Sequence, residues 1–183
     1  MELLKNTPIQ KTFKVFILIF LGTLALTISA KIKIPFYPVP MTMQTFVVLF
    51  LGLAFGYKIG IATVTVYLLE GIIGMPVFSN SPEKGVGLIY FTGPTMGYLI
   101  GFLVAVFFAG YLNLNKNIFI NFVKLVFAVS TIYLLGILWL GTLIGWDKPI
   151  LQLGVTPFLL AEFFKISLLT LITKKIIKLR NFI

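Results

Sequence analysis

The sequence predicts an all-α protein that crosses a membrane as a bundle of six helices. Of its 183 residues, 59% are hydrophobic and only 11% are charged, whereas soluble domains are nearer half apolar and about a quarter charged. The mean hydropathy of the chain is +1.07, so polar surface is too scarce to cover it in water. At about 20 residues a span, the length fits six spans in a single domain over residues 1–183.

The first span is expected over residues 15–34. Lysines precede this apolar run, and it contains the sequence Ile-Ser-Ala at residues 28–30, a pattern that superficially resembles a signal peptide. The apolar run is long for such a signal and further spans follow it, so we expect a retained helix. Residues 35–40 then contain three prolines, which cannot continue a helix and predict a stiff, extended segment.

Two shorter spans are expected next, over residues 42–55 and 60–73. Residues 56–60 begin and end with glycine and predict a tight turn between these spans. Each span is short of a full crossing, so we expect it to be tilted, extended by its flanks or partly buried. The sequence Gly-Met-Pro at residues 74–76 ends the third span, and residues 77–92 then predict a loop.

The last three spans are expected over residues 94–112, 122–141 and 155–173. Pro94 suits the first turn of a helix, where its missing N–H would have no partner. A polar turn at residues 113–121 and a loop at residues 142–154 separate these three spans.

Positive charges fall unequally on the two sides of this expected bundle, whose net charge is +10. Ten cations fall on the side of the termini: Lys5, Lys11, Lys14, Lys58, Lys116, Lys124, Lys174, Lys175, Lys178 and Arg180. Four fall on the opposite side: Lys31, Lys33, Lys84 and Lys148. Because cytoplasmic loops carry an excess of Lys and Arg, we expect a multi-pass plasma-membrane protein with both termini in the cytoplasm. The cations then meet anionic lipid rather than nucleic acid.

The composition also bears on the classes of site that the chain can hold. It contains no Cys and no His, so disulfide chemistry is excluded and the commonest general base and metal ligand are missing. Its five acidic residues are scattered, and we expect neither a metal nor a cofactor. Since the sequence has no GxxxxGK[ST] motif, any ATP-driven transport would need a motor in another chain.

Glu162 and Lys165 in the last span are the residues that most favour a ligand site. They are three residues apart and therefore lie on one face of a helix. An ionised group within a bilayer costs about 2.5 kcal/mol or more, so it faces a partner or a wet cavity. A structural ion pair remains an alternative, but the position level with the outer loops favours a site. There Lys165 would suit a carboxylate ligand and Glu162 an N–H donor.

Other candidate ligand residues are expected at the same level of the bundle. Gln44 opens the second span and Asn80 lies in the loop after the third, and their amides offer donors and acceptors to a neutral polar ligand. Phe78, Tyr90 and Tyr98 can wall a mostly apolar pocket. Taken singly, each of these five residues is better explained by loop structure or packing.

A pair of small residues in the first span suggests a contact between helices. Ala25 and Ser29 are four residues apart, a spacing that lets two helix backbones approach closely. The pair fits either packing within the bundle or docking of another membrane subunit.

Three sequence blocks resemble the BioY family, the biotin-specific substrate-binding (S) components of energy-coupling-factor (ECF) transporters. The blocks are IPFYPVPMTMQT at residues 34–45, YLLEGIIGMPVF at residues 67–78 and GPTMGYLIGF at residues 93–102. The resemblance covers about residues 15–174. Glu70 and Met96 depart from it, since the family usually has an apolar residue and a glycine at these positions.

The resemblance implies a six-helix membrane protein with an outward-facing biotin site, working with a membrane coupling (T) subunit and ATPase subunits. The family's last span usually carries an Asp and a Lys three apart that contact biotin, and Glu162 and Lys165 resemble this pair with one added methylene. Family contacts from the loop after the third span point to Asn80. The family's Ala-xxx-Ala pair, which faces the coupling subunit, resembles Ala25 and Ser29.

Biotin uptake is the function that these observations favour. Biotin has an apolar body, one carboxylate for Lys165, and a ureido ring with donors and acceptors for Glu162, Asn80 and Gln44. The alternatives are an S component or a lone transporter for another small vitamin-like carboxylate, and a structural membrane subunit. An intramembrane enzyme using Glu162 as acid or base is disfavoured by the absence of His, Cys and a second catalytic carboxylate, so we expect no enzyme.

Overall fold

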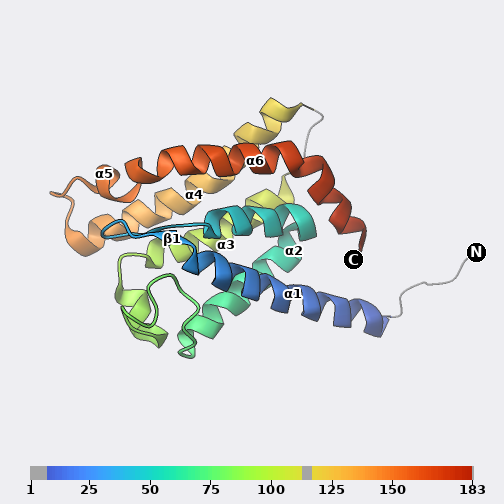
Figure 1. Cartoon of the computed structure of the whole chain (residues 1–183), viewed down its shortest axis with the longest axis horizontal. Helices are drawn as coiled ribbons and strands as arrows, with labels where there is room; N and C mark the ends of the chain where they lie inside the picture. The colour runs from blue at the N-terminus through green and yellow to red at the C-terminus, as the bar shows by residue number, and fades with distance from the viewer. Residues whose placement is uncertain (1–7, 113–116, 183) are drawn as a thin grey trace, which may run out of the picture.

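The computed structural model describes residues 8–112 and 117–182, which form a bundle of helices (Figure 1). The elements are α1 (Pro8–Lys31), β1 (Lys33–Ile34), β2 (Met41–Thr42), α2 (Gln44–Ile72), η1 (Gly87–Thr92), α3 (Met96–Tyr111), α4 (Ile118–Ile144), α5 (Ile150–Gly154), η2 (Thr156–Phe158), α6 (Leu159–Ile177) and η3 (Lys178–Phe182). The all-α prediction is confirmed, since the two-residue strands β1 and β2 are the only non-helical regular elements in these ranges.

The element α2 consists of two helical arms that fold back on each other at Gly56. This residue has φ 77° and ψ 171°, a left-handed conformation that glycine adopts without steric cost. A Cβ built on Gly60 would lie 3.5 Å from the Cα of Gly52, whereas eight residues of continuous helix rise about 12 Å. The two arms are visible in Figure 1, so the turn predicted within residues 56–60 is present.

Helical stretches long and apolar enough to cross a membrane cover Ile9–Lys31, Gln44–Ile72, Ile118–Ile144 and Ile150–Arg180. The fifth apolar helix, α3, is shorter, with 16 residues. Because Gln44–Ile72 contains both arms of α2, the described elements are consistent with six predicted spans. The arms are the short second and third spans that the sequence predicts.

The first span is placed differently from its predicted range of 15–34. It begins at least as early as Pro8 and ends at Lys31. The next residues, Lys33–Ile34, leave the helix because they pair antiparallel with Met41–Thr42. The proline-rich segment between the strands is therefore the turn of a short hairpin.

Two later boundaries also differ from the sequence prediction. Helix α4 begins at Ile118, within the predicted polar turn, because the side chain of Asn117 accepts a hydrogen bond from the Phe119 N–H at 2.8 Å and caps the helix. The last span is interrupted before α6, at η2, where Pro157 cannot donate a helical hydrogen bond. The predicted loop at residues 142–154 contains the short helix α5.

The two ends of the bundle differ in what they contain. The start of α1, the turn at Gly56 and the end of η3 lie at one end, here called the terminal end, and the β1–β2 hairpin, the α2–α3 loop and α5 lie at the other, the loop end (Figure 1). Lys5 and Lys116, which enter the charge count above, lie outside the described residues.

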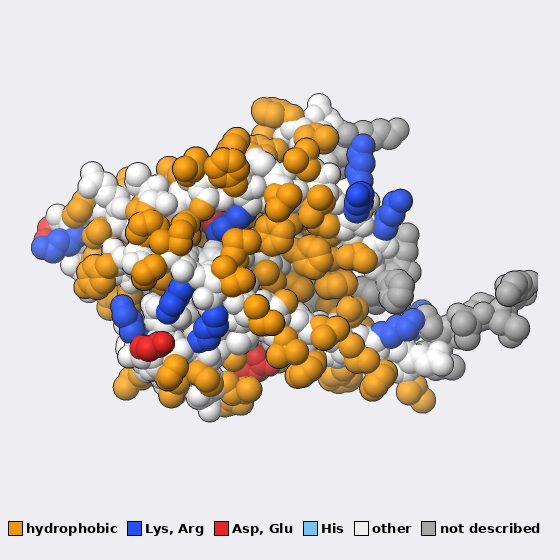
Figure 2. Space-filling model, in the orientation of Figure 1, with side chains coloured by type: hydrophobic (Ala, Val, Ile, Leu, Met, Phe, Trp, Pro, Cys, Tyr) orange, Lys and Arg blue, Asp and Glu red, His pale blue; other side chains and the backbone are white. Residues whose placement is uncertain are grey.

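The surface of the bundle is mostly hydrophobic. Figure 2 shows hydrophobic side chains over most of the viewed face, with most of the charged side chains toward its two ends and a few between them. Phe16, Phe127 and Leu171 are each half or more exposed. Lipid suits such a belt, whereas water would penalise an apolar patch of this size.

At the terminal end, Arg180 joins η3 to two other helices. Its Nε donates to the carbonyl of Leu53 at 2.9 Å, and its Nη2 donates to the carbonyls of Gly52 and Gly110 at 3.2 Å. These carbonyls lie in the last turns of the first α2 arm and of α3, where helices leave acceptors without internal partners. The guanidinium thus satisfies acceptors at two negative helix ends.

Candidate functional site

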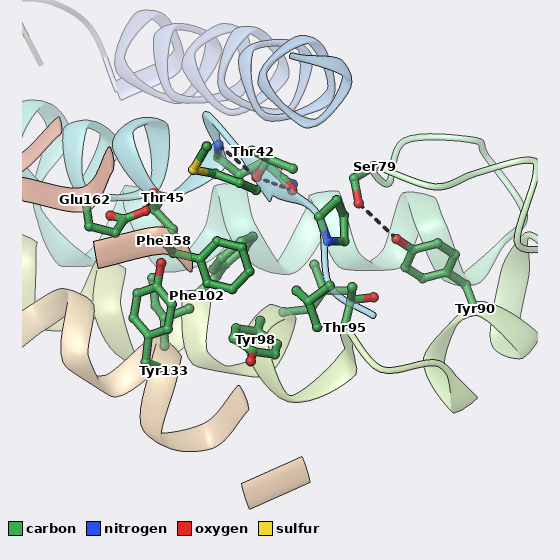
Figure 3. Close-up of a pocket in the computed structure, with 16 residues that line it drawn as sticks. Thr42, Thr45, Ser79, Tyr90, Thr95, Tyr98, Phe102, Tyr133, Phe158 and Glu162 are labelled. Carbon is green, nitrogen blue, oxygen red and sulfur yellow. Dashed lines mark hydrogen bonds between the residues drawn. The ribbon is translucent and has the colours of Figure 1, made fainter. Parts of the chain in front are cut away.

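A cavity lies at the loop end, between the β1–β2 hairpin and helices α2, α3, α4 and α6 (Figure 3). It is lined by Val39, Pro40, Met41, Thr42, Gln44, Thr45, Ser79, Tyr90, Thr95, Tyr98, Leu99, Phe102, Ile132, Tyr133, Phe158 and Glu162. The space between these side chains, including the mouth, is about 530 Å³. Small-ligand pockets have mostly apolar walls with a few polar groups, and the lining of this cavity has the same character.

Lys165 and Glu162 form a buried ion pair in the wall of this cavity. The Nζ of Lys165 lies 2.8 Å from Oε1 of Glu162, and the two side chains are 8% and 7% exposed. The same Nζ donates to the carbonyl of Thr42 at 2.6 Å and to Oγ1 of Thr45 at 3.1 Å. Since an ammonium group has three donors, the protein itself uses all of them.

The carboxylate of Glu162 is only half satisfied. Its Oε1 accepts bonds from Lys165 and from the Thr45 hydroxyl, the latter at 2.7 Å. Its Oε2 is buried and has no hydrogen-bond partner, the only such buried side-chain N or O atom in the part of the chain that the structure describes. An unsatisfied buried acceptor is costly. One oxygen of the Glu162 carboxylate therefore lies at the cavity without a donor.

Tyr133 and Phe158 line the same part of the cavity as Thr45 and Glu162 (Figure 3). Figure 3 shows the hydroxyl end of Tyr133 pointing toward the side of the cavity on which Glu162 lies. The rings of Tyr133 and Phe158 are stacked, with centroids 6.0 Å apart. This part of the site combines flat apolar surface with one carboxylate and one hydroxyl, a combination that suits a ring carrying N–H and C=O groups.

Gln44 connects the cavity wall to the loop after α2. Its Nε2 donates to the Tyr67 hydroxyl at 2.7 Å, and that hydroxyl donates to the carbonyl of Val77 at 3.0 Å. The Gln44 Oε1 accepts a bond from Thr42 at 3.3 Å. The buried amide therefore fixes the start of α2 relative to the segment that follows it.

Tyr90 and Ser79 close the cavity on the side of the loops. Their hydroxyl oxygens lie 3.2 Å apart, and Figure 3 shows this bond. The backbone N–H of Asn80 also donates to the Tyr90 hydroxyl, at 3.4 Å. The Tyr90 ring stacks on Phe78 at a centroid distance of 4.7 Å, so this wall is built almost entirely from the α2–α3 loop.

Four of the seven predicted ligand residues line the cavity: Gln44, Tyr90, Tyr98 and Glu162. Lys165 lies directly behind Glu162. Phe78 is buried beneath Tyr90. The side chain of Asn80 is turned to Lys33, whose Nζ donates to its Oδ1 at 3.1 Å. The structure thus brings the predicted residues to one end of the bundle but separates those that face the cavity from those that support it.

Several cavity residues are absent from the sequence prediction, above all Thr45, Tyr133 and Phe158. Tyr133 gave a usable signal, because a hydroxyl in the middle of an apolar span needs a polar environment. Thr45 lies beside Gln44 in the block at residues 34–45. Nothing in the sequence marks Phe158 as a cavity residue, because it cannot be told apart from the other phenylalanines among the 19 in the chain.

The small-residue pair of α1 is not an open stripe on the surface. Ser29 is buried, and its hydroxyl donates to the carbonyl of Leu26 at 2.8 Å. Ala25 is partly buried. In this conformation the exposed face of α1 carries aromatic side chains instead, including Phe16 and Phe20.

No group of three or more His, Cys, Asp or Glu side chains suited to a metal ion occurs among the described residues. The acceptors and donors of the cavity therefore come from hydroxyl groups, one amide and the Glu162–Lys165 pair. Such groups bind a ligand by hydrogen bonds and charge.

Comparison with known proteins relates this architecture to transporters. The chain is 33% identical over 150 residues to a probable biotin transporter BioY of Pyrococcus horikoshii, covering 82% of this chain and 88% of that protein. It is 34% identical over 158 residues to the biotin transporter BioY of Thermotoga maritima, covering 86% of this chain and 92% of the relative.

The fold is similar to a crystal structure of the S-component for biotin from an ECF-type ABC transporter. The TM-score is 0.77 at 25% sequence identity, and the alignment covers 94% of this chain and 95% of that one. The sequence also matches the model of the BioY family over residues 5–182, nearly its whole length. With this extent of agreement in sequence and fold, the chain belongs to the BioY family.

Proposed function

We propose that this chain captures biotin in the cavity at the loop end and supports biotin uptake as the S component of an ECF-type transporter. The relatives are named as biotin transporters, and the similar crystal structure is a biotin S component. The single observation that carries the proposal is the buried, half-satisfied carboxylate of Glu162 in a small, mostly apolar cavity. In this reading the chain is a binding and transport protein, not an enzyme.

The free Oε2 of Glu162 would accept a hydrogen bond from a ureido N–H of biotin. The aromatic rings of Phe158, Tyr98 and Phe102 would cover the apolar ring system and chain of the ligand. Because water is excluded from such a site, each hydrogen bond gains strength from the low local dielectric. The rings and the carboxylate together select a molecule that is apolar over most of its length and polar at one ring.

Lys165 would act on the ligand chiefly through Glu162. Its three donors are already used by Glu162, Thr42 and Thr45, so a ligand carboxylate would have to replace one of these bonds to reach it. The contact of 2.8 Å between the ammonium group and Oε1 fixes the orientation of the Glu162 carboxylate, which leaves Oε2 without a partner.

Transport requires further chains. The proposed partners are a membrane coupling subunit and ATPase subunits, since this sequence has no ATP-binding motif. The charge asymmetry supports an orientation with both termini in the cytoplasm and the loop end outside. Biotin would then enter from outside, and release would need movement of the bundle against the coupling subunit.

Equilibrium binding of biotin to the purified protein in lipid nanodiscs tests the proposal. We expect saturable binding at micromolar biotin and a rise in the unfolding temperature with ligand concentration. The variant Glu162→Gln should bind at least 30-fold more weakly, because it keeps the size of the side chain but loses the charged acceptor. Asp147→Asn, which removes an exposed carboxylate at the same end, should bind as the parent does.

Folded parent protein that fails to bind micromolar biotin would contradict the proposal. Competition by biotin methyl ester, desthiobiotin and unrelated vitamin-like carboxylates would show whether the site prefers biotin or another small carboxylate. Uptake of labelled biotin by cells with and without coexpressed coupling and ATPase subunits then tests the partners.

A further inference from the structure

Lys31, the last residue of α1, reaches across to the loop between α2 and α3. Its Nζ donates to the carbonyl of Phe78 at 2.8 Å and to the carbonyl of Ser81 at 2.7 Å. Because these acceptors are 47 and 50 residues away in sequence, the bonds join two separate parts of the loop end.

Lys33, in β1, contacts the same loop segment. Its Nζ donates to the carbonyl of Ser79 at 2.6 Å and to Oδ1 of Asn80 at 3.1 Å. The two lysines thus engage every residue of the segment 78–81, and three of the four acceptors are backbone carbonyls. Side-chain substitution in the loop would leave those carbonyls in place, so the lysines recognise the path of the backbone.

Neither lysine forms a salt bridge in the described part of the chain, where the ion pairs are Lys148–Asp147 and Lys165–Glu162. The ammonium groups are held by neutral oxygens, in bonds that are stronger than neutral ones because the donor is charged. Lys31 is exposed and Lys33 is partly buried, so water can replace each carbonyl when the segment moves. Figure 2 shows Lys and acidic side chains gathered at this end of the molecule.

The segment held by the lysines closes one side of the cavity. Ser79 lines the cavity, and its hydroxyl is bonded to Tyr90, which also lines it. On its other side, Tyr90 borders a second hollow that contains Asn80, Lys84 and Thr95. Tyr90 and Thr95 line both spaces and therefore form the partition between the second hollow and the cavity.

The backbone of the segment forms a compact turn. Internal bonds hold it together, including Ser81 N–H to Phe78 and Lys84 N–H to Asn80 at 3.3 and 2.7 Å. Glycines with positive φ flank it: Gly74 at 99° and Gly85 at 95°. Glycine adopts positive φ without steric cost, so Gly74 and Gly85 are the candidate hinges of the segment.

We propose that Lys31 and Lys33 form a latch that holds segment 78–81, and with it Tyr90, over the cavity. They are positioning residues that contact no ligand and set the rates at which ligand enters and leaves. The identity of the ligand rests on the proposed function, but the latch itself does not.

The test compares the double variant Lys31→Met/Lys33→Met with Lys148→Met, which removes an exposed cation at the same end. Association and dissociation of radiolabelled biotin are followed by rapid filtration on protein in nanodiscs. The double variant should raise both rate constants at least tenfold and change the dissociation constant less than threefold. Lys148→Met should leave both rates within twofold, and Lys31→Arg/Lys33→Arg should restore slow exchange.

Two kinetic outcomes would overturn the latch. Unchanged rates in the double variant would show that the bonds do not control access. A rise in the dissociation rate alone, with affinity lost in proportion, would show that the lysines stabilise the bound ligand directly.

Hydrogen–deuterium exchange without ligand tests the latch even if biotin does not bind. Amides of residues 78–85 should exchange at least tenfold faster in the double variant, while amides of α3 and α4 keep the parental rates. Equal exchange of residues 78–85 in variant and parent would contradict the latch. Absence of biotin binding would contradict only the proposed function. If the double variant does not fold, Lys33→Met alone is subjected to the same comparison.

Discussion

The terminal end and the loop end of the bundle use their cations in different ways. At the terminal end, Arg180 donates to three helix carbonyls, and glycines bring the helices into close contact. A Cβ on Gly52 would lie 2.7 Å from the carbonyl oxygen of Val106 and 2.9 Å from the Gly110 nitrogen. There is no space between these helices, and the charge only joins elements together.

At the loop end, the cations hold groups that border a cavity. Lys165 holds Glu162 beside a cavity, with one carboxylate oxygen left without a partner. Lys31 and Lys33 hold a segment of loop that forms part of the cavity wall. A cation held by protein oxygens is therefore not by itself a sign of function, and the unsatisfied Oε2 of Glu162 beside the cavity is what distinguishes the loop end. Substitutions at the two ends should therefore separate stability from binding.

The largest effect is expected from Lys165→Met. Removing one partner of a buried ion pair leaves an uncompensated charge and costs about 3–5 kcal/mol, and Glu162 should also lose its fixed orientation. We expect a large fall in unfolding temperature and biotin binding weakened at least 100-fold. The double variant Lys165→Met/Glu162→Gln should recover much of the stability but none of the binding, as measured by thermal unfolding and equilibrium titration. Normal biotin binding by either variant would show that the Glu162–Lys165 pair is not part of the binding site.

Arg180→Met is the corresponding change at the terminal end. Three carbonyls would lose a charged donor, and because water can reach part of this site, we expect a loss of about 2 kcal/mol of stability. Biotin affinity should stay within threefold of the parent. Lys178→Met removes a neighbouring exposed cation and should leave the stability unchanged. A loss of biotin affinity well beyond threefold would show that a change at the terminal end alters the cavity at the loop end.

Gly52→Ala tests the close packing of the terminal end without changing any charge. The added methyl group would contact the backbone of α3, which has no flexible side chain to move aside. We expect a loss of about 1–3 kcal/mol in the free energy of unfolding and unchanged biotin affinity, measured by denaturation and titration of the same preparation. An unchanged free energy of unfolding would show that these helices can separate at little cost.

Tyr67→Phe should have the smallest effect. The change removes the hydroxyl that accepts from Gln44 and donates to Val77, at a cost of about 1 kcal/mol. If Gln44 positions the cavity wall, biotin binding should weaken roughly fivefold. Tyr57→Phe at the terminal end is the matched control and should leave the affinity unchanged. Equal affinities in the two variants would show that the Gln44 network is purely structural.

The sequence predicted the number and order of the helices because hydrophobic runs and the glycines and prolines between them report directly on local structure. The turn at Gly56 and the end of the first helix before the prolines follow from backbone restrictions that belong to single residues, whereas the prolines form the turn of a hairpin and not the extended segment that was predicted. Helix boundaries were less predictable. The start of α4 depends on the cap at Asn117, and the end of α1 depends on strand pairing with residues farther along the chain.

For the site, spacing alone placed Glu162 and Lys165 on one face of one helix, since both belong to the same element and the helical repeat is fixed. The tertiary structure is needed to show that Lys165 donates to Thr42 in β2 and Thr45 in α2, that Oε2 of Glu162 has no hydrogen-bond partner, and that Asn80 turns to Lys33 instead of the cavity. These outcomes depend on contacts between residues up to 123 positions apart. Local sequence sets which groups a helix face presents, whereas the packing of distant elements sets which of those groups remain unsatisfied and open to a ligand.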